Sequence, residues 1–420
     1  MFRGSIRPRR TRELVTQLPL PQPGQAAAVA FVASHLGHVV DGDVIASLRF
    51  SGGQQQADAA LAAFDVSGYA RRRNEVYPQP SRGASGLSPY IRHGLLSLRE
   101  VWDHVAGGPD RDVAKYRDEL LWQEFARHWY GRLGSRTSTG VRQQLIGDPK
   151  RDGWNRDMAC MELPLDELEE DGWLVNQTRM WLSSEWAVRR GAQWQRGEDY
   201  FFRHLLDGSR AANRLGWQWT VGVGSNKAYG FSRWQVENRA KNLCASCELA
   251  LACPIEEWPD DPTFTSAEQP VELTSTSAVD PMAGPRRSKQ IGEPELVWLT
   301  AESIGQRDPA LRAHPGLPAV FVFDEPLLAS LRLSAKRLVF LTETLAEIGA
   351  VRPLELYLGR PVDVLETGAA AVTFAPVPGF ARRSEQIKPA VMHPWPWLTP
   401  PTSGSIASFS AWKKSVKRPR

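Results

Sequence analysis

The sequence predicts the mixed fold class α + α/β, in which an all-helical domain is followed by a small parallel α/β domain. Apolar residues recur at helical spacing between residues 41 and 258. Residues 259–292 are rich in Pro, Ser and Thr without a period, which is typical of a linker. Residues 293–420 hold short apolar runs around a helical segment, which indicates parallel strands. Residues 1–40 remain as a basic N-terminal extension.

Five segments of the first domain predict helices, because their apolar residues return every three or four positions. In chain order they are ADAALAAFDVSGYARRRNEV (57–76), SLREVWDHVAG (97–107), RDELLWQEFARHWYGRLG (117–134), DELEEDGWLVNQTRMWLSSEWAVRRG (166–191) and GEDYFFRHLLDGSRAANRLGWQW (197–219).

Four runs of the second domain predict strands, and one segment predicts an amphipathic helix. The strands are ELVWL (295–299), PAVFVFD (318–324), LELYLG (354–359) and AAVTFAP (370–376), and the helix is SAKRLVFLTETLAEIG (334–349). The tail from residue 389 is expected to be irregular.

The composition excludes several classes of protein. No stretch approaches 18 consecutive apolar residues, which argues against a membrane span. Four cysteines in 420 residues do not make a disulfide scaffold, so we expect a reducing, cytoplasmic location. The basic start reads as an extension or first helix, with an organelle transit peptide as the alternative. We also expect a monomer.

The net charge of +4 is unevenly distributed. Residues 3–12 carry five arginines, residues 71–73 are all arginine, and no acidic residue follows Glu385. Such basic ends are either solvated tails or surfaces that attract phosphates, since Lys and Arg release counterions from nucleic acid.

Three of the four cysteines lie in CASCELALACPIEEWP (244–259), as Cys244, Cys247 and Cys253. Cys160 lies 84 residues before Cys244. Four thiolates can hold either zinc or an iron–sulfur cluster, and the Cys-Pro pair at the last position is typical of the cluster. Spacing alone leaves three interpretations open: a cluster, a zinc site or free thiols.

Several polar and aromatic pairs could carry chemistry. Glu119 and Trp122 share one helix face, and on this pair alone an exposed Glu above a core Trp is favoured over a ligand-binding role. Trp217 and Trp219 cannot both face the same way in a helix. ASGLSPY (84–90) leads into a helix and could either bind a phosphate or form a plain N-cap.

Residues 69–232 resemble the flavin-binding domain of photolyases and cryptochromes. The stretches that carry the resemblance, in the family's order, are YARRRN, ASGLSPYIRHGLLSLREVW, DELLWQEF, GWLVNQTRM and WQRGEDYFFRHLLDGSRAANRLGWQW. The cysteines resemble those of the iron–sulfur bacterial branch, where one cysteine precedes the Gly of a Gly-aromatic motif by twelve residues. Cys160 precedes Gly172 by the same twelve. The resemblance therefore implies a 4Fe-4S cluster on Cys160, Cys244, Cys247 and Cys253.

The second domain is similar to the Rossmann-like antenna domain of the same family, which normally precedes the flavin domain. The matching stretches are VWLTAESIGQRDPAL, PAVFVFDEPLL, SAKRLVFLTETLAEI, PGFARRSEQI and SGSIASFSAWKK. The chain thus resembles a circularly permuted member with a shortened antenna-type domain, whose antenna chromophore is unknown.

The resemblance implies FAD as cofactor and assigns residues to it. Those that match flavin-binding positions are Tyr69, Ser85, Leu87, Ser88, Asn176, Arg179, Asp207 and Asn213, the last facing flavin N5. Arg179 and Asp207 match an ion pair beside the flavin ring. The chain departs from the family's pattern at Ala84, where the family has Thr, and at Ser209, where it has Asp.

Glu119, Trp122 and Trp219 match residues that hydrogen-bond and stack a flipped pyrimidine dimer in damaged DNA, while Gln123 stands where many members have Arg. Trp217 and Trp194 match the first two members of an electron relay. The third member has no match at its usual place, and its candidates are Trp154, Trp181 and Trp186.

The implied function is that of a deoxyribodipyrimidine photo-lyase, an enzyme in which photo-excited reduced FAD splits cyclobutane pyrimidine dimers. Members that repair (6-4) photoproducts carry a histidine where this chain has Val175 and Asn176, so repair of that lesion is not expected. The alternative is a cryptochrome-like blue-light receptor without repair activity. A nucleic-acid-binding iron–sulfur flavoprotein that works without light is a more distant third.

Overall fold

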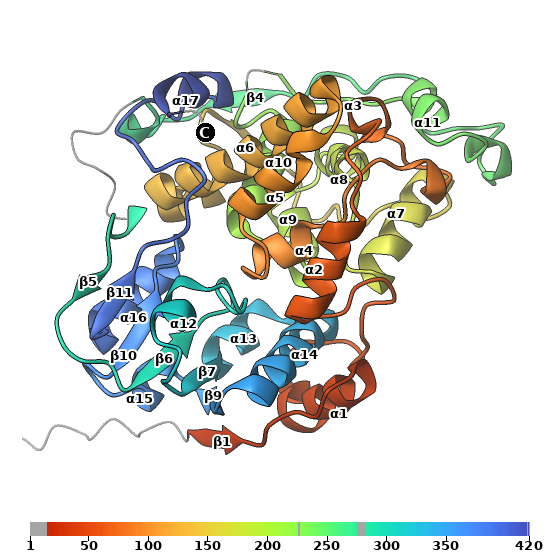
Figure 1. The fold of residues 1–420 in the computed structure, drawn as a ribbon. Helices are drawn as coiled ribbons and strands as arrows, with labels where there is room; N and C mark the ends of the chain where they lie inside the picture. Colours follow the sequence, from red (N-terminus) through yellow and green to blue (C-terminus); the bar gives the residue numbers. More distant parts are fainter. Residues whose placement is uncertain (1–14, 226, 275–282, 418, 420) are drawn as a thin grey trace, which may run out of the picture.

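The computed structural model describes residues 15–225, 227–274, 283–417 and 419, so the arginines of residues 3–12 lie outside the described part (Figure 1). The chain forms a helical part and a sheet-containing part that pack against each other. No described helix has both the length and the apolar character that crossing a bilayer requires.

The longest described helix of the helical part is α6 (Asp110–Leu133). The other helices of this part are α2 (Gln54–Ala63), α3 (Tyr69–Arg72), α4 (Ser88–Arg92), α5 (Leu98–His104), α7 (Ala159–Glu170), α8 (Asn176–Ser183), α9 (Trp194–His204), α10 (Arg210–Val221) and α11 (Arg233–Arg239). Helix α6 packs on α3, α5 and α10. All five predicted helical segments are helical, but three of them are interrupted.

The segment 166–191 shows why such interruptions occur. It divides into the end of α7, α8 and a π-helical turn, η5 (Ser184–Arg189). Gly172 separates α7 from α8 with a φ of +70°, a conformation that favours glycine. A Cβ at Gly172 would lie 2.9 Å from the carbonyl oxygen of His204, so the start of α8 packs closely against the end of α9.

The second part contains the predicted parallel sheet. Five parallel strands lie in the order β9-β7-β6-β10-β11: β6 (Leu296–Leu299), β7 (Ala319–Asp324), β9 (Leu354–Gly359), β10 (Ala370–Thr373) and β11 (Val391–His393). Counted along the chain this is the 3-2-1-4-5 order of a doubly wound fold. Val297 and Leu299 join the main core, while Trp298 joins a second core on the opposite face, as strand alternation requires.

Helices cover both faces of this sheet. They are α12 (Pro309–Ala313), α13 (Glu325–Leu331), α14 (Ala335–Val351), α15 (Pro361–Val364) and α16 (Pro378–Ile387). A short strand, β8 (Leu333–Ser334), precedes α14 and pairs with β2 (Val40–Asp41).

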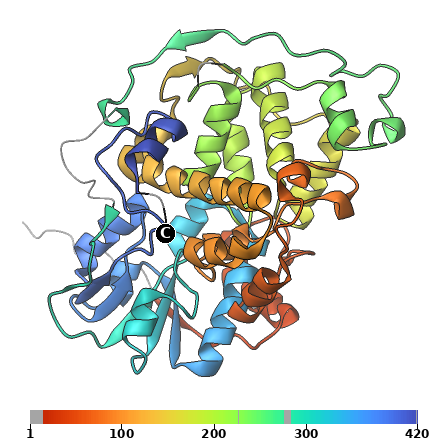
Figure 2. The ribbon, with the colours of Figure 1, turned by 45° about the horizontal axis from the view of Figure 1, so that its top comes forward.

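Three segments lie differently from the sequence expectation. Within residues 1–40, β1 (Thr16–Leu18) pairs antiparallel with β9, and α1 (Gln25–Leu36) packs on α14. Within the expected linker, β4 (Phe264–Ser266) pairs with β3 (Gln143–Leu145), and β5 (Lys289–Gln290) pairs with β11. The tail from residue 389 was expected to be irregular, but it contains strand β11 of the sheet. It also contains α17 (Phe409–Ser415), which packs on α6, away from the sheet (Figure 2).

Helix α14 was expected to be amphipathic, but it is buried on nearly all sides because it lies between the sheet and the helical part. Its polar side chains bind the ends of other helices. Lys336 Nζ donates to the carbonyl of Glu169, 2.5 Å away, and Arg337 Nε donates to that of Leu205, 3.0 Å away. Glu343 accepts from the amide of Gly52 at 2.7 Å, ahead of α2. These contacts follow the helix dipole, with cations at C-termini and an acid at an N-terminus.

We expect Glu343→Gln to stabilise the protein more at pH 8 than at pH 5. Burial raises the pKa of Glu343 from 4.5 to about 7, against the lowering effect of the Gly52 amide. A carboxyl group whose pKa is higher in the folded state than in the unfolded state stabilises the fold at low pH. That stabilisation is lost as the pH rises from the pKa of the unfolded state through the pKa of the folded state. A glutamine at this position does not ionise and can still accept from the Gly52 amide. The free energy of unfolding of Glu343→Gln relative to the parent should therefore rise by up to about 3 kcal/mol between pH 5 and pH 8. Urea unfolding at both pH values measures the difference.

The exposed Glu293→Gln serves as the control for the substitution itself. A stability difference between Glu343→Gln and the parent that is the same at pH 5 and pH 8 would contradict the prediction.

Candidate functional site

Arg179 and Asp207 form the centre of the candidate site. Arg179 Nη2 lies 2.8 Å from Asp207 Oδ2, and Arg179 Nε donates to the carbonyl of Leu174. The Asp207 side chain is 8% exposed and that of Arg179 25%. Asp207 Oδ1 is buried and has no hydrogen-bond partner among the described residues. A buried carboxylate oxygen without a donor indicates a place where a ligand hydroxyl or N–H could bind.

Asn213 on α10 is held in one orientation by Glu198 on α9. Its Nδ2 donates to Glu198 Oε1 at 2.8 Å and to the Glu198 carbonyl at 2.9 Å. Both amide hydrogens are therefore used, and Oδ1 is the polar atom left for a ligand. The Glu198 carboxylate is paired with Arg210 and lies 3.7 Å from Arg214. Burial raises the pKa of Glu198, and the two arginines oppose that shift.

Tyr69 and Ser85 are brought together by Tyr116, a residue of α6 that the sequence analysis did not single out. The rings of Tyr69 and Tyr116 meet edge to face at 4.8 Å, and the Tyr116 hydroxyl donates to Ser85 Oγ at 3.1 Å. Leu87, two positions after Ser85, is fully buried. Ser88 Oγ accepts from Trp173 Nε1 at 2.9 Å. Asn176 is exposed at the first position of α8.

Glu119 lies between two cations. Its Oε1 is 2.8 Å from Lys115 Nζ and 3.1 Å from Arg73 Nη1, which follows α3. Trp122, one turn further along α6, is half-buried and stacks face to face on Phe409 with ring centroids 4.0 Å apart. Trp219 is 45% exposed, whereas Trp217 is 2% exposed, so the two indoles face opposite ways as the sequence predicted.

The tryptophans close to Trp217 include two of the three candidates for the third relay member. Trp217 and Trp186 both border Gly197, where a Cβ would lie 2.3 Å from Trp217 Cη2 and 3.1 Å from Trp186 Cδ1. Trp186 in turn lies 4.4 Å from Trp154, centroid to centroid. Trp194 is buried nearby in sequence, and Trp181 stacks on Phe231 instead. Of the three candidates for the third member, Trp186 and Trp154 are therefore linked to Trp217.

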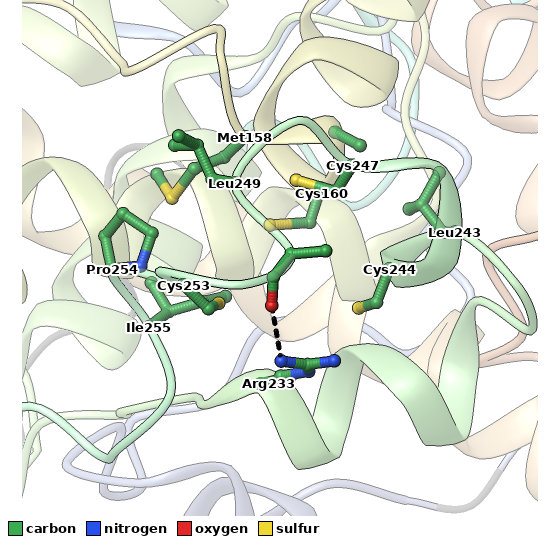
Figure 3. Close-up of a pocket in the computed structure, with 12 residues that line it drawn as sticks. Met158, Cys160, Arg233, Leu243, Cys244, Cys247, Leu249, Cys253, Pro254 and Ile255 are labelled. Atoms are coloured by element: carbon green, nitrogen blue, oxygen red, sulfur yellow. Dashed lines mark hydrogen bonds between the residues drawn. The ribbon is translucent and has the colours of Figure 1, made fainter.

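All four cysteines line one pocket, with Cys160 on α7 and the other three on the segment after α11 (Figure 3). Arg233 also lines this pocket and donates to the carbonyl of Ala250 at 2.9 Å. Burial raises the pKa of the Cys160 thiol, and the three neighbouring thiols add to the effect. The free hollow is about 20 Å³, little more than one water-sized sphere. No group of three or more His, Cys, Asp or Glu in the described ranges is compact enough to hold a metal ion.

A larger cavity of about 630 Å³ lies between the two parts of the chain, at the carboxyl end of β6. Arg127, Arg312 and Trp395 are among the residues that line it, and the Arg127 guanidinium lies 5.1 Å from the Trp395 ring centroid. None of the predicted flavin, lesion or cysteine residues lines this cavity.

Two residues of the site could have been found by helical spacing alone. Tyr116 precedes Glu119 by three positions on α6, and Glu198 follows Trp194 by four on α9. Phe409 could not, because its partner Trp122 is 287 residues away in the chain.

Comparisons with known proteins match part of the chain to DNA photolyases. Residues 159–245 match the family model described as the FAD binding domain of DNA photolyase. A deoxyribodipyrimidine photo-lyase of Synechococcus is 28% identical over 188 residues, which cover 41% of this chain and 37% of the relative. One of Thermus thermophilus is 30% identical over 226 residues, covering 50% and 46%. The chain thus spans less than half the length of these curated relatives.

Among solved structures, a bacterial class III photolyase from Agrobacterium tumefaciens is 23% identical, covers 40% of this chain and 37% of its own, and has a TM-score of 0.34. That score is too low to establish a shared overall fold. Residues 159–245, in the helical part, are thus similar to the FAD binding domain of DNA photolyase, and about half of the chain or less is similar to curated deoxyribodipyrimidine photo-lyases.

Proposed function

We propose that the protein is a light-driven DNA repair enzyme that binds FAD and splits cyclobutane pyrimidine dimers. The observation that carries the proposal is the Arg179–Asp207 pair with its unpartnered Oδ1, inside the segment that matches the FAD binding domain of DNA photolyase. The photo-lyase relatives agree with this reading, although they align with only part of the chain.

The residues of the site fit a flavin. Asp207 offers a buried acceptor, and Asn213 offers Oδ1, because Glu198 occupies its amide hydrogens. An acceptor at this position suits the protonated N5 of a reduced flavin better than the unprotonated N5 of an oxidised one. Tyr69, Ser85, Leu87 and Ser88 would hold the diphosphate end. When bound, reduced FAD supplies under light the electron that cleaves the dimer.

The lesion would be held by Glu119, Trp122 and Trp219. A dimer is poorly stacked in the duplex, so flipping it out costs little, and aromatic faces can then bind it. Glu119 would hydrogen-bond a pyrimidine base, exchanging part of its contact with Lys115 and Arg73 for the substrate. Val175 is buried and cannot donate a proton, which favours the cyclobutane lesion over the (6-4) photoproduct.

We propose further that Cys160, Cys244, Cys247 and Cys253 hold a 4Fe-4S cluster. Four thiols on one pocket, with Arg233 as the charged neighbour, suit such a donor set. The hollow is smaller than a cluster needs, so the segment 244–253 must spread when the cluster binds. A single zinc ion would instead require four sulfurs about 3.8 Å apart, from the tetrahedral Zn–S distance of about 2.3 Å.

The second part of the chain would be the antenna-type domain of a circularly permuted photolyase, supported by its 3-2-1-4-5 strand order.

Blue-light irradiation of reduced, FAD-loaded protein with lesion-containing oligonucleotides tests the function. We expect the cyclobutane dimer to be restored and the (6-4) photoproduct to persist. Full FAD binding without dimer repair would favour the alternative, a cryptochrome-like photoreceptor. The observation that favours this alternative is the engagement of Glu119 in two ion pairs.

Trp219→Ala should weaken binding of dimer-containing DNA by about 1–3 kcal/mol, the usual worth of one stacked base. Its indole is 45% exposed, so the substitution should cost the fold little. Trp234→Ala is the matched control, since Trp234 on α11 is 65% exposed and has no assigned role. Fluorescence anisotropy with a labelled oligonucleotide measures both variants. Equal losses in the two would remove Trp219 from the lesion site.

A further inference from the structure

We infer that the C-terminal segment 398–415 completes the lesion site, because Phe409 fixes the indole of Trp122 and leaves only one of its faces for a base. This inference rests on the proposed function. It makes Phe409 a positioning residue, which acts on the lesion through Trp122.

The segment is anchored along one face of α6. Glu124, His128 and Arg132 are spaced by four residues, so they lie on the same side of the helix. Glu124 Oε1 accepts from the amide of Thr399 and His128 Nδ1 accepts from Trp412 Nε1, both at 2.8 Å. Arg132 donates to the carbonyl oxygens of Thr402 and Gly404. The segment therefore has one defined position on α6.

Helix α17 is built into the core at the end of this segment. Ser408 caps it by accepting from the amide of Ala411, and Lys413 is paired with Asp118 of α6. Trp412 is 1% exposed, and its ring packs on Phe125 at 5.5 Å. These contacts hold α17 firmly on α6, so we do not expect DNA to displace it.

Phe409 lies parallel to Trp122, with an interplanar angle of 11° and centroids 4.0 Å apart. Phe125 meets the edge of the same indole at 5.8 Å. An indole has two faces, and Phe409 covers one completely enough to exclude a base. A dimer that stacks on Trp122 must therefore use the opposite face.

Fixing the indole before DNA arrives removes an entropic cost from lesion binding. Immobilising a side chain on binding costs about 0.5–1.5 kcal/mol, which corresponds to about a two- to tenfold change in affinity. Undamaged DNA is held mainly through its phosphates and does not need Trp122. Loss of Phe409 should thus reduce discrimination between damaged and undamaged DNA rather than DNA binding in general.

The test compares Phe409→Leu, which keeps apolar volume without a flat face, with Phe409→Tyr, which keeps the ring. Phe380→Leu is the matched control, because Phe380 stacks on Trp298 in the second core, away from α6. The dissociation constants of FAD-loaded protein are measured by anisotropy for a dimer-containing oligonucleotide and for its undamaged counterpart. We expect discrimination to fall about two- to tenfold in Phe409→Leu and to stay within about twofold of the parent in the other two variants.

Each result bears on the inference. If the parent protein shows no preference for the dimer, the proposed function fails and the inference falls with it. If the parent discriminates and Phe409→Leu discriminates equally well, the inference alone is overturned. If Phe409→Leu weakens binding of both oligonucleotides by the same factor, the role of Phe409 is structural, which also overturns the inference.

Discussion

Replacing Cys160 by serine will remove the iron from anaerobically purified protein and destabilise the fold. Cys160 is buried on α7, whereas its three partners lie on a partly exposed segment that begins 84 residues later. The proposed cluster therefore joins two distant parts of the helical domain, and metal ligation is coupled to folding. Loss of a comparable covalent cross-link costs about 2–5 kcal/mol. Iron and sulfide analysis, together with urea unfolding, measures both effects.

Cys247→Ser separates ligation from packing. It removes a ligand from the half-exposed segment, so it should lose as much iron as Cys160→Ser while lowering the free energy of unfolding less. Zinc in place of iron in the parent protein, or a full complement of iron in Cys160→Ser, would refute the cluster.

Asp207→Asn is expected to weaken flavin binding and to lower the stability of the fold. It removes the charge that faces Arg179 and replaces an acceptor by an amide in a buried position. Removing one partner of a fully buried pair costs about 3–5 kcal/mol. The loss in free energy of unfolding caused by Asp207→Asn should be smaller, about 2–3 kcal/mol, because the Arg179 side chain is 25% exposed and keeps some solvation. We expect at least a tenfold rise in the dissociation constant for FAD, about 1.4 kcal/mol.

The comparison is with Asp148→Asn, which breaks an exposed pair with Arg151 whose side chains are 44% and 61% exposed. That change should alter stability by less than about 1 kcal/mol and leave the flavin in place. Flavin absorbance after gel filtration and urea unfolding report the two effects. If Asp207→Asn retained a stoichiometric flavin, Asp207 would not belong to the cofactor site.

Local patterns predicted most of the elements but not how they are partnered. The four predicted strands are present, because alternating or continuous apolar runs between turn residues have few other stable conformations. Helix α14 was predicted as amphipathic from its sequence pattern, and its polar residues include Lys336, Arg337 and Glu343. In the structure they bind helix ends of the other part of the chain, which no local pattern can show. The pairing of β1 with β9 was missed for the same reason, since three residues carry too little periodicity.

For the candidate site, the resemblance placed the Arg179–Asp207 pair, and the structure contains it. Trp217, which the resemblance assigned to an electron relay, is buried. The resemblance did not foresee that Glu119 is held between Lys115 and Arg73, or that Asn176 is exposed. Lys115 lies one helical turn before Glu119 on α6, but Arg73 lies 46 residues earlier in the chain, and no local pattern brings it to Glu119. The roles assigned to these residues remain predictions.

Each of the two parts of the structure includes a segment from the opposite end of the chain. The N-terminal side contributes β1 and α1 to the sheet, and the C-terminal side contributes α17 to the helical core. Neither stretch is then a self-sufficient folding unit. Residues 293–420 made alone would leave the edge of β9 unpaired and open to aggregation. A polypeptide cut once between β4 and β5 would yield two interlocked fragments that stay associated, so this protein is suited to fragment complementation and poorly suited to expression as separate domains.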